Sequence, residues 1–216
     1  MSHTPKTAII GLGYIGQAIA ADLAKSGTPF IAADRKLEKA KELAAGWGAS
    51  ATPSDIRSAL AEADIAILAI PFEAISEFLT SYAAELEGKI IIDPSNPIAL
   101  DGNGGFKKII EPNQSAGVLN AKHLPKGAKL VKAFGTLGAA SLAAAAHQNS
   151  QKAVLFYATD NSSIQSQIEQ LIAAAGFEAL KVGGLDQSIR IEVFGDLHEY
   201  GALGKTVTLE EANSHL

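Results

Sequence analysis

Short apolar runs alternate with longer amphipathic stretches along most of the sequence. The apolar runs predict seven β-strands, at residues 7–11, 30–34, 64–70, 89–93, 129–134, 153–159 and 177–182. Several of these runs are continuously apolar, which is typical of strands that helices cover on both faces. The alternation of strand and helix therefore predicts an α/β fold built on a doubly wound, mostly parallel sheet.

Apolar residues at helical spacing fill the intervals between these runs. Ile15, Ile19 and Leu23 recur every four positions, and similar repeats start at Ile75 and Ile164. Glycine is common just after a helix, because it adopts a left-handed conformation without strain. The glycines expected in this role are Gly27, Gly46, Gly88 and Gly176.

Composition narrows the class of protein. The chain has 216 residues, of which 47% are hydrophobic and 19% charged, so it holds enough apolar material for one large core. Cysteine is absent, which excludes disulfides, thiolate nucleophiles and cysteine-based metal sites. The net charge of -5 argues against a nucleic-acid partner. The histidines are scattered rather than paired, so we expect no metal site.

No stretch of the sequence is long and apolar enough to span a membrane. The longest stretch without Asp, Glu, Lys or Arg, at 133–151, is rich in Ala, Gly and Ser and ends in polar residues. Glycines interrupt the first apolar run at once, which is unlike a secretory signal. We therefore expect a cytoplasmic protein with no membrane partner.

One segment has the spacing of a dinucleotide-binding turn. Residues 9–16 read I-I-G-L-G-Y-I-G, between a predicted strand and an amphipathic helix, and Asp34 ends the next strand 23 positions after Gly11. Gly11 permits the tight turn, Gly13 lets backbone N–H groups approach a pyrophosphate, and Gly16 lets the helix lie close to the strand. The sequence thus predicts a Rossmann NAD(P)-binding fold, with cofactor contacts from Gly11, Leu12, Gly13, Tyr14, Ile15 and Gly16.

The residues that follow the second strand bear on the choice of cofactor. The carboxylate of Asp34 can accept hydrogen bonds from ribose hydroxyls, which favours NAD. Arg35 and Lys36 come next, and an arginine there can pair with the 2′-phosphate of NADP. We expect NADP to be the cofactor, with NAD as the alternative.

Three more strands end on the edge where such sheets bind ligands. Residues 70–72 would place an apolar edge and a ring near the nicotinamide, and residues 95–97 offer compact polar groups in a proline-stiffened loop. Residues 132–136 offer a cation, an aromatic face and a hydroxyl. The expected cofactor contacts are Ile70, Pro71, Phe72, Ser95, Asn96 and Pro97, and the expected substrate contacts are Asn96, Lys132, Phe134, Gly135 and Thr136.

These segments resemble, in order and spacing, the NADP oxidoreductase, coenzyme F420-dependent family of dinucleotide-binding enzymes. The resemblance rests on residues 11–16, Asp34-Arg35, 70–72, 93–97 and 131–134. The cytosolic domain of the STEAP metalloreductases is similar to this family. The resemblance implies hydride transfer between NADPH and a flavin or deazaflavin such as coenzyme F420, and in some members a homodimer. Family members often have Asn at the position of Gly135, and archaeal members Ser or Thr at that of Asp34, so the acceptor and the cofactor choice stay open.

Two regions depart from the strand–helix rhythm. Residues 101–129 form a glycine-rich loop with a short helical pattern around 115–122. Residues 185–216 are expected to form a helical segment, and the apolar positions on its one face are Ile189, Val193, Leu197 and Tyr200. This segment is too short for a core of its own, so we expect it to pack over the cleft or across a two-fold interface. The predicted dinucleotide-binding domain is the remainder, 1–184.

The sequence lacks the usual acid–base motifs. Tyr-x-x-x-Lys, H-E-x-x-H, G-x-S-x-G and the phosphate-binding loop are all absent, which argues against short-chain dehydrogenases, metalloproteases, serine hydrolases and P-loop ATPases. A flavin acceptor needs little more than orientation and a dry pocket, because its ring takes up the electrons. Lys132 is the one candidate catalytic side chain. Two alternatives remain: a small carbonyl or imine reductase that uses Lys132, and an NADP(H)-binding redox sensor without catalysis.

Overall fold

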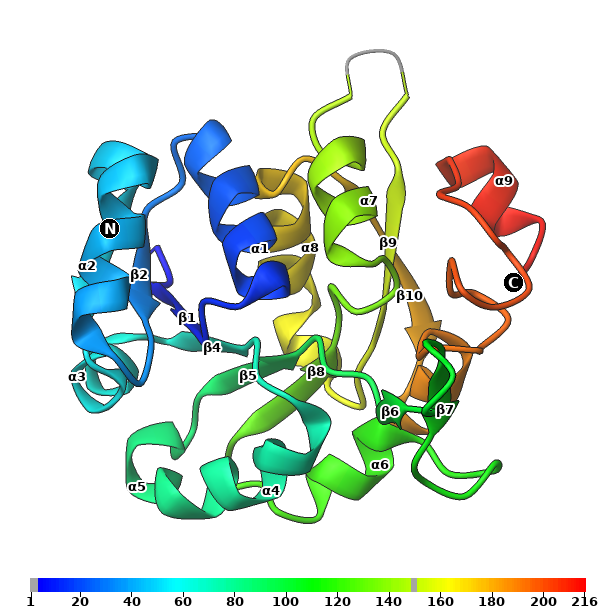
Figure 1. The fold of residues 1–216 in the computed structure, drawn as a ribbon, viewed down its shortest axis with the longest axis horizontal. Helices are drawn as coiled ribbons and strands as arrows, with labels where there is room; N and C mark the ends of the chain where they lie inside the picture. The colour runs from blue at the N-terminus through cyan, green and yellow to red at the C-terminus, as the bar shows by residue number, and fades with distance from the viewer. Residues whose placement is uncertain (1–3, 149–150) are drawn as a thin grey trace.

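An eight-stranded sheet runs through the centre of the structure (Figure 1). The computed structural model describes residues 4–148 and 151–216; the start of the predicted 1–184 domain and part of the uncharged stretch 133–151 lie outside the described residues. The strands of this sheet are β1 (Thr7–Ile10), β2 (Phe30–Ala33), β3 (Ala51–Ser54), β4 (Ile65–Leu68), β5 (Ile90–Asp93), β8 (Lys129–Lys132), β9 (Val154–Ala158) and β10 (Glu178–Gly183). Neighbouring strands pair in parallel except β8 and β9, so the sheet is mostly parallel, as predicted.

The strand order determines where a ligand crevice forms. The order is β10-β9-β8-β5-β4-β1-β2-β3, and its last six strands have the 3-2-1-4-5-6 arrangement of a Rossmann sheet. From β1 the chain builds outward through β2 and β3, and it then returns to add β4 on the other side. The order reverses between β1 and β4, and a crevice opens at their carboxyl ends.

Helices cover both faces of this sheet (Figure 1). They are α1 (Tyr14–Lys25), α2 (Leu37–Trp47), α3 (Ile56–Glu62), α4 (Phe72–Ser81), α5 (Ala83–Leu86), α6 (Ala116–Ala121), α7 (Ala139–Ala145), α8 (Gln165–Ala174) and α9 (Leu209–Asn213). Side chains of a strand alternate between the faces. Ile9 accordingly joins the core under α1, α7 and α8, whereas Ala8 and Ile10 join the core under α3, α4 and α5.

All seven predicted strands are present, but β3, both strands of a small hairpin in the glycine-rich loop and one helix end were missed. β3 lies at the edge of the sheet and contains Pro53, and its side chains are exposed or half-buried, so it lacks the apolar run that marks the others. The prediction that Gly46 ends a helix was wrong, because Gly46 lies inside α2. Gly48, with a φ of 62°, follows that helix instead.

The glycine-rich loop contains a small antiparallel hairpin. β6 (Ile98–Leu100) pairs with β7 (Phe106–Lys108), and Asp101 accepts backbone N–H groups of the turn between them. α6 follows at the predicted place, with Ser115 accepting the N–H of Val118 at its start. This region therefore carries structure of its own beside the crevice.

The carboxy-terminal segment differs from the single amphipathic helix that the apolar stripe predicted. A 3₁₀ helix, η3 (Leu185–Arg190), is followed by turns and then by the short α9. Phe194 has a φ of 73°, and a Cβ at Gly195 would lie 2.3 Å from the carbonyl oxygen of Arg190, so the chain turns back on itself here. Leu197 of the predicted stripe is buried together with Ile191, because both pack on strands β9 and β10 of the same chain, whereas Tyr200 of the stripe is exposed.

No helix in the described part of the chain is long and apolar enough to cross a membrane. Residues 4–148 and 151–216 also contain no group of three or more His, Asp or Glu side chains arranged to hold a metal ion.

Candidate active site

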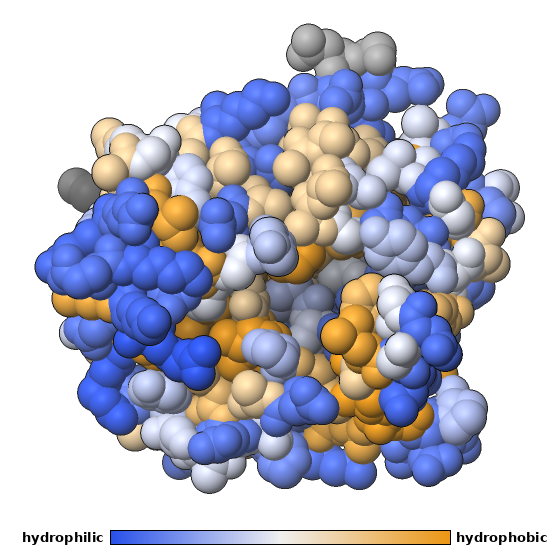
Figure 2. All heavy atoms as spheres, viewed as in Figure 1, coloured by the Kyte–Doolittle hydropathy of each residue, from blue (hydrophilic) through white to orange (hydrophobic). Residues whose placement is uncertain are grey.

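Two adjoining cavities form one groove at the carboxyl ends of β1 and β4. The first, of about 610 Å³, includes Asp34 and Arg35 and is called here the Asp34 half. The second, of about 540 Å³, includes Ser95 and Asn96 and is called the Asn96 half. The residues that line both are Gly13, Ala69, Ile70 and Pro71, so the halves are continuous. Figure 2 shows this face of the molecule, with hydrophobic surface at its centre.

The glycine turn lies where the two halves meet. Gly11 has a φ of 91°, and a Cβ there would lie 2.6 Å from the carbonyl oxygen of Ala69. A Cβ at Gly16 would lie 2.0 Å from the carbonyl oxygen of Gly11, so α1 can cross the turn only without a side chain. Gly13 differs from both, because a Cβ there meets no protein atom within 4 Å and would enter the groove.

The start of α1 fits a phosphate group. Gly13 precedes this helix, and no side chain caps its first N–H groups. Such N–H groups and the positive end of the helix dipole attract anions. The open space at Gly13 therefore has the chemistry of a pyrophosphate cradle.

Asp34 is held by the chain itself. Its carboxylate accepts the N–H of Leu12 at 3.0 Å and the ammonium group of Lys39 at 3.0 Å. Burial alone would raise the pKa of this carboxyl, but the hydrogen bonds from Leu12 and Lys39 outweigh burial and lower it. Asp34 thus fixes the glycine turn to the end of β2, and its charge is largely balanced by Lys39.

Lys39 is a residue that the motif analysis missed. It lies in the first turns of α2 and lines the Asp34 half together with Arg35. Its position five residues after Asp34 was the available signal, because the start of α2 turns that side chain back toward the strand end. The Asp34 half thus carries two cations, which are accompanied by the carboxylates of Asp34 and Glu77.

Asn96 joins three segments of the wall of the Asn96 half. Its side-chain nitrogen donates to the carbonyl of Gly135 at 2.9 Å, and its side-chain oxygen accepts the N–H of Val193 at 2.8 Å. Beside it, the hydroxyl oxygen of Ser95 is buried and has no hydrogen-bond partner. The Ser95 hydroxyl is therefore an unsatisfied polar group within this wall, whereas the amide of Asn96 is already engaged.

Lys132 does not line the groove, contrary to the position expected for a catalytic or substrate-binding side chain. Its side chain is 3% exposed, and its ammonium group lies 3.0 Å from a carboxylate oxygen of Asp93. It also donates to the carbonyl of Ser95 at 2.5 Å, while Asn120 donates to Asp93 at 2.7 Å. These contacts make Lys132 part of a buried network beneath the loop that carries Ser95 and Asn96.

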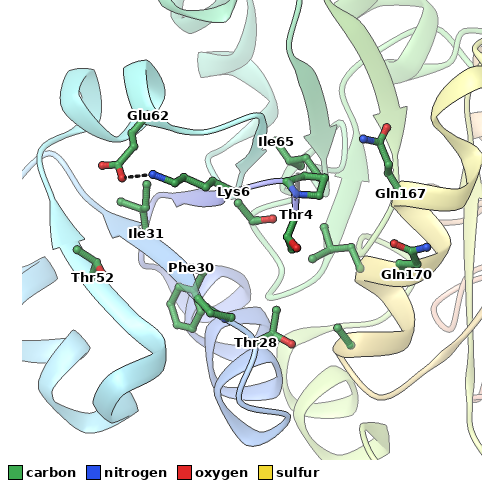
Figure 3. Close-up of a pocket in the computed structure, with 15 residues that line it drawn as sticks. Thr4, Lys6, Thr28, Phe30, Ile31, Thr52, Glu62, Ile65, Gln167 and Gln170 are labelled. Atoms are coloured by element: carbon green, nitrogen blue, oxygen red, sulfur yellow. Dashed lines mark hydrogen bonds and ion pairs between the residues drawn. The ribbon is translucent and has the colours of Figure 1, made fainter. Parts of the chain in front are cut away.

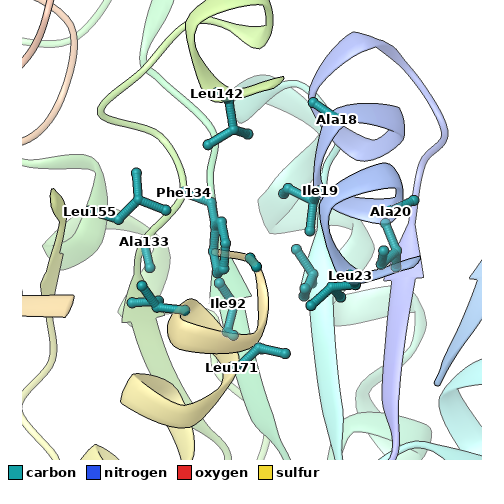
Figure 4. Close-up of a cluster of buried hydrophobic side chains, with 14 of the residues drawn as sticks. Ala18, Ile19, Ala20, Leu23, Ile92, Ala133, Phe134, Leu142, Leu155 and Leu171 are labelled. Atoms are coloured by element: carbon teal, nitrogen blue, oxygen red, sulfur yellow. The ribbon is translucent and has the colours of Figure 1, made fainter. Parts of the chain in front are cut away.

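The three residues expected beside Lys132 are also inside the protein. Phe134 is fully buried and points into the core between α1, α7 and the sheet (Figure 4). A Cβ at Gly135 would lie 2.6 Å from the carbonyl oxygen of Pro94, so this glycine permits close packing of two loops rather than a wider pocket. Thr136 is 2% exposed, and its hydroxyl has no partner.

The predicted residues therefore fall into two groups. Those that line the groove are Gly11, Leu12, Gly13, Tyr14, Ile15, Asp34, Arg35, Ile70, Pro71, Phe72, Ser95 and Asn96. Those that do not are Gly16, Lys36, Pro97, Lys132, Phe134, Gly135 and Thr136.

The carboxy-terminal segment supplies residues that the motifs did not reveal. His198 and Tyr200 line the Asn96 half, and Glu199 accepts the N–H of Gly138. The His198 ring lies 2.9 Å from the carbonyl of Gly135 and accepts the N–H of Tyr200 at 2.9 Å. Burial lowers the pKa of His198, and the Glu199 carboxylate raises that of the Tyr200 phenol. At neutral pH this wall therefore presents an uncharged imidazole and a protonated phenol.

Another cavity, of about 440 Å³, lies at the opposite edge of the sheet (Figure 3). It is lined by Thr7, Phe30 and Ile65, which begin β1, β2 and β4, and by residues of α8. Lys6 and Glu62 form an ion pair at 2.6 Å on its rim. This cavity is remote from the strand ends where the motifs meet, so it does not belong to the groove.

Comparison with known proteins agrees with these features. The family model NADP oxidoreductase, coenzyme F420-dependent, matches residues 6–97. A hypothetical protein from Sinorhizobium meliloti has a solved structure that is 32% identical, covering 94% of this chain and 95% of that chain with a TM-score of 0.81. No match was found among proteins of curated function.

More distant structures share the fold. A candidate F420-dependent NADP reductase from Arthrobacter sp. FB24 is 18% identical, covering 85% of this chain and 87% of that chain with a TM-score of 0.73. An imine reductase from Bacillus cereus is 19% identical, covering 84% of this chain and 55% of that chain with a TM-score of 0.59. At these identities the similarity establishes the Rossmann architecture.

Proposed function

Because this chain belongs to the NADP oxidoreductase, coenzyme F420-dependent family, we propose that it transfers hydride between NADP(H) and a flavin or deazaflavin acceptor. The single observation that carries the proposal is the continuous groove, whose halves meet at Gly13. The Asp34 half would hold the adenosine end of the cofactor, and the start of α1 would hold its pyrophosphate. Ile70 and Pro71 would then contact the nicotinamide, and the Asn96 half would receive the acceptor.

The charges of the Asp34 half favour NADP over NAD. The carboxylate of Asp34 already accepts hydrogen bonds from Leu12 and Lys39, so it is less available to a ribose hydroxyl. Arg35 and Lys39 both line this half and can balance a 2′-phosphate. Lys36 lies next to them, outside the lining, and adds positive charge.

The residues of the chain mainly bind and orient the cofactor and the acceptor, and they exclude water from the site. NADPH, when bound, supplies the hydride, which carries two electrons and one hydrogen. The reduced flavin needs one further proton, which it exchanges with water, so no general acid is required. Leu137, Val193 and Ile98 make the Asn96 half apolar.

This assignment gives Lys132 a role that acts through other residues. Its ammonium group holds Asp93 and the carbonyl of Ser95, and thereby fixes the loop at the base of the Asn96 half. We propose that it is a positioning residue rather than a contact to the acceptor. Asn96 has the same kind of role, because it ties that loop to Gly135 and Val193.

A small imine or carbonyl reductase is the second candidate, and one observation favours it. Such a reaction needs a proton for the product. The phenol of Tyr200 lines the Asn96 half and is protonated at neutral pH, so it can donate a proton there, although Glu199 raises its pKa and makes the proton harder to release. If the chain reduces imines, Tyr200 takes the place that the motifs assigned to Lys132.

The remaining expectations are proposed on the same basis. We propose that 1–184 is the cofactor-binding domain and that 185–216 completes its acceptor wall. We also propose that the protein is cytoplasmic and forms a homodimer.

The test is anaerobic NADPH oxidation against riboflavin, FMN, FAD, a deazaflavin and cyclic imines, followed by absorbance. Reduction of a flavin-type ring supports the proposal. Reduction of imines alone would favour the second candidate. Tight NADPH binding without turnover of any acceptor would favour the redox-sensor alternative.

A further inference from the structure

The two halves of the groove differ in charge. The Asp34 half is lined by the cations Arg35 and Lys39, and by the carboxylates of Asp34 and Glu77. The residues that line the Asn96 half in the described chain include no lysine or arginine, and Glu73 is the charged side chain among them. His198 also lines this half, but burial lowers its pKa and both of its ring nitrogens are engaged. The groove is thus balanced in charge where it meets adenosine and acidic where it meets the acceptor.

Helix N-termini do not supply the missing positive charge. α4 and α7 both begin on the Asn96 half, and free N–H groups there would attract an anion. Glu73 lies in the first turn of α4, where its carboxylate balances the helix dipole. The carboxylate of Glu199 accepts the N–H of Gly138, which precedes α7. Both helix starts are therefore already matched with negative charge from the chain.

Cationic side chains outside the lining of this half already have partners within the chain or point away from the groove. Lys132 is buried against Asp93. Lys108 donates to the carbonyls of Pro112 and Gln114 at 3.2 and 2.9 Å, and Arg190 pairs with Asp196 at 2.8 Å. Lys107 follows Phe106, which lines the groove, so strand alternation directs the lysine to the other face of the hairpin.

We infer that the acceptor is an uncharged planar ring without a phosphate or carboxylate tail, such as riboflavin or a deazaflavin core, rather than FMN or intact coenzyme F420. This inference rests on the proposed function. An anionic tail in the Asn96 half would lie near Glu73 and Glu199 with no cation to balance it, so repulsion would weaken its binding. An uncharged ring is not repelled by these carboxylates, and it packs against apolar and aromatic side chains. The reaction balances as NADPH plus ring plus one proton from water giving NADP⁺ and the two-electron-reduced ring.

The test compares riboflavin with FMN, which differ by one phosphate. At low ionic strength, we expect riboflavin to have a kcat/KM at least tenfold higher than FMN in anaerobic NADPH oxidation. Added salt screens charges beyond about 10 Å at 0.1 M, so it should raise the FMN value and leave riboflavin unchanged. Quenching of flavin fluorescence by the NADP⁺-bound protein gives the same comparison without turnover.

Two matched variants locate the effect. Glu73→Gln should narrow the ratio of riboflavin to FMN at least threefold, because it removes a negative charge from the Asn96 half. Glu77→Gln removes an equal charge one helical turn away in the Asp34 half, and should leave the ratio unchanged. Equal use of the two flavins, or a preference for FMN or coenzyme F420, would overturn the inference and leave the proposed function standing. Failure of every flavin to bind and to be reduced would overturn both.

Discussion

The ammonium group of Lys132 lies 3.0 Å from the carboxylate of Asp93, and both side chains are buried. A buried ion pair is costly to break, because the remaining charge loses its partner in a medium of low polarity. Asp93 also accepts the N–H of Ser95 at 2.8 Å, so the ion pair helps to hold the loop that carries Ser95 in its conformation.

We predict that Lys132→Met lowers the free energy of unfolding by about 3–5 kcal/mol. The measurement is urea denaturation followed by circular dichroism. Adding Asp93→Asn to Lys132→Met should recover part of the loss, because the uncompensated charge is gone. A Lys132→Met protein of normal stability would contradict the prediction.

Gly13→Val is expected to abolish NADP(H) binding while the protein stays folded. The new side chain meets no protein atom within 4 Å of its Cβ and fills the space of the pyrophosphate. Fluorescence titration with NADPH measures the effect. Gly16→Ala is the contrasting variant, because its Cβ would lie 2.0 Å from a carbonyl oxygen and should lower the melting temperature itself. Normal NADPH affinity in Gly13→Val would remove the basis for the cofactor site.

Arg35→Ala should weaken the binding of NADPH more than that of NADH. The expected difference in binding free energy is about 1.5–3 kcal/mol, for the loss of a charge-assisted phosphate contact. Lys39→Ala should have a mixed effect, because it removes a cation and also releases Asp34, to which Lys39 is paired at 3.0 Å. NADH binding by this variant is therefore expected to be retained or improved. Equal losses of affinity for the two cofactors in Arg35→Ala would show that Arg35 does not contact the 2′-phosphate.

Asp22 is predicted to make stability fall as pH rises. Burial raises its pKa to about 7, an effect that the nearby Lys25 only partly offsets, and one carboxylate oxygen is buried without a partner. The unfolded chain releases this proton near its ordinary pKa of about 3.9, so the folded state binds more protons between there and about pH 7. The stabilisation is complete at low pH and is lost across this range.

Asp22→Asn should therefore flatten the pH dependence of unfolding and raise stability at pH 8 by about 1–3 kcal/mol. Asp55→Asn is the control: Asp55 caps α3 at the surface and should leave the slope above pH 5 unchanged. A wild-type protein whose unfolding free energy does not fall between pH 5 and pH 7 would contradict the prediction.

The sequence predicted best those features in which local pattern and tertiary packing agree. The central strands are buried on both faces, so their apolar runs were sufficient, and the turn at Gly11 needs glycine for steric reasons that hold in any such fold. β3 was not predicted because an edge strand buries little apolar surface and tolerates a proline such as Pro53. The apolar stripe after residue 185 gave a wrong prediction for another reason: Leu197 is buried against the sheet, but turns around Phe194 and Gly195 bring it there, and Tyr200 of the same stripe is exposed.

Sequence motifs predicted only part of the candidate site. Residues next to a strand end in sequence were placed at the correct edge, but the direction of each side chain depends on packing. Lys132 turns inward because Asp93 lies beside it on the neighbouring strand, in register. His198 and Tyr200 reach the groove from a segment about 60 residues further along the chain than Gly135, and the signal for such a contact is three-dimensional.

Gly13 and Pro71 belong to both halves of the groove, and this shared wall has a kinetic consequence. A cofactor bound along the groove becomes part of the surface against which the second molecule packs. On the proposed function the acceptor site would be complete only in the binary complex, and we predict that the substrates bind in a compulsory order. Under that order NADPH would bind first and NADP⁺ would leave last, and the two would compete for the free protein.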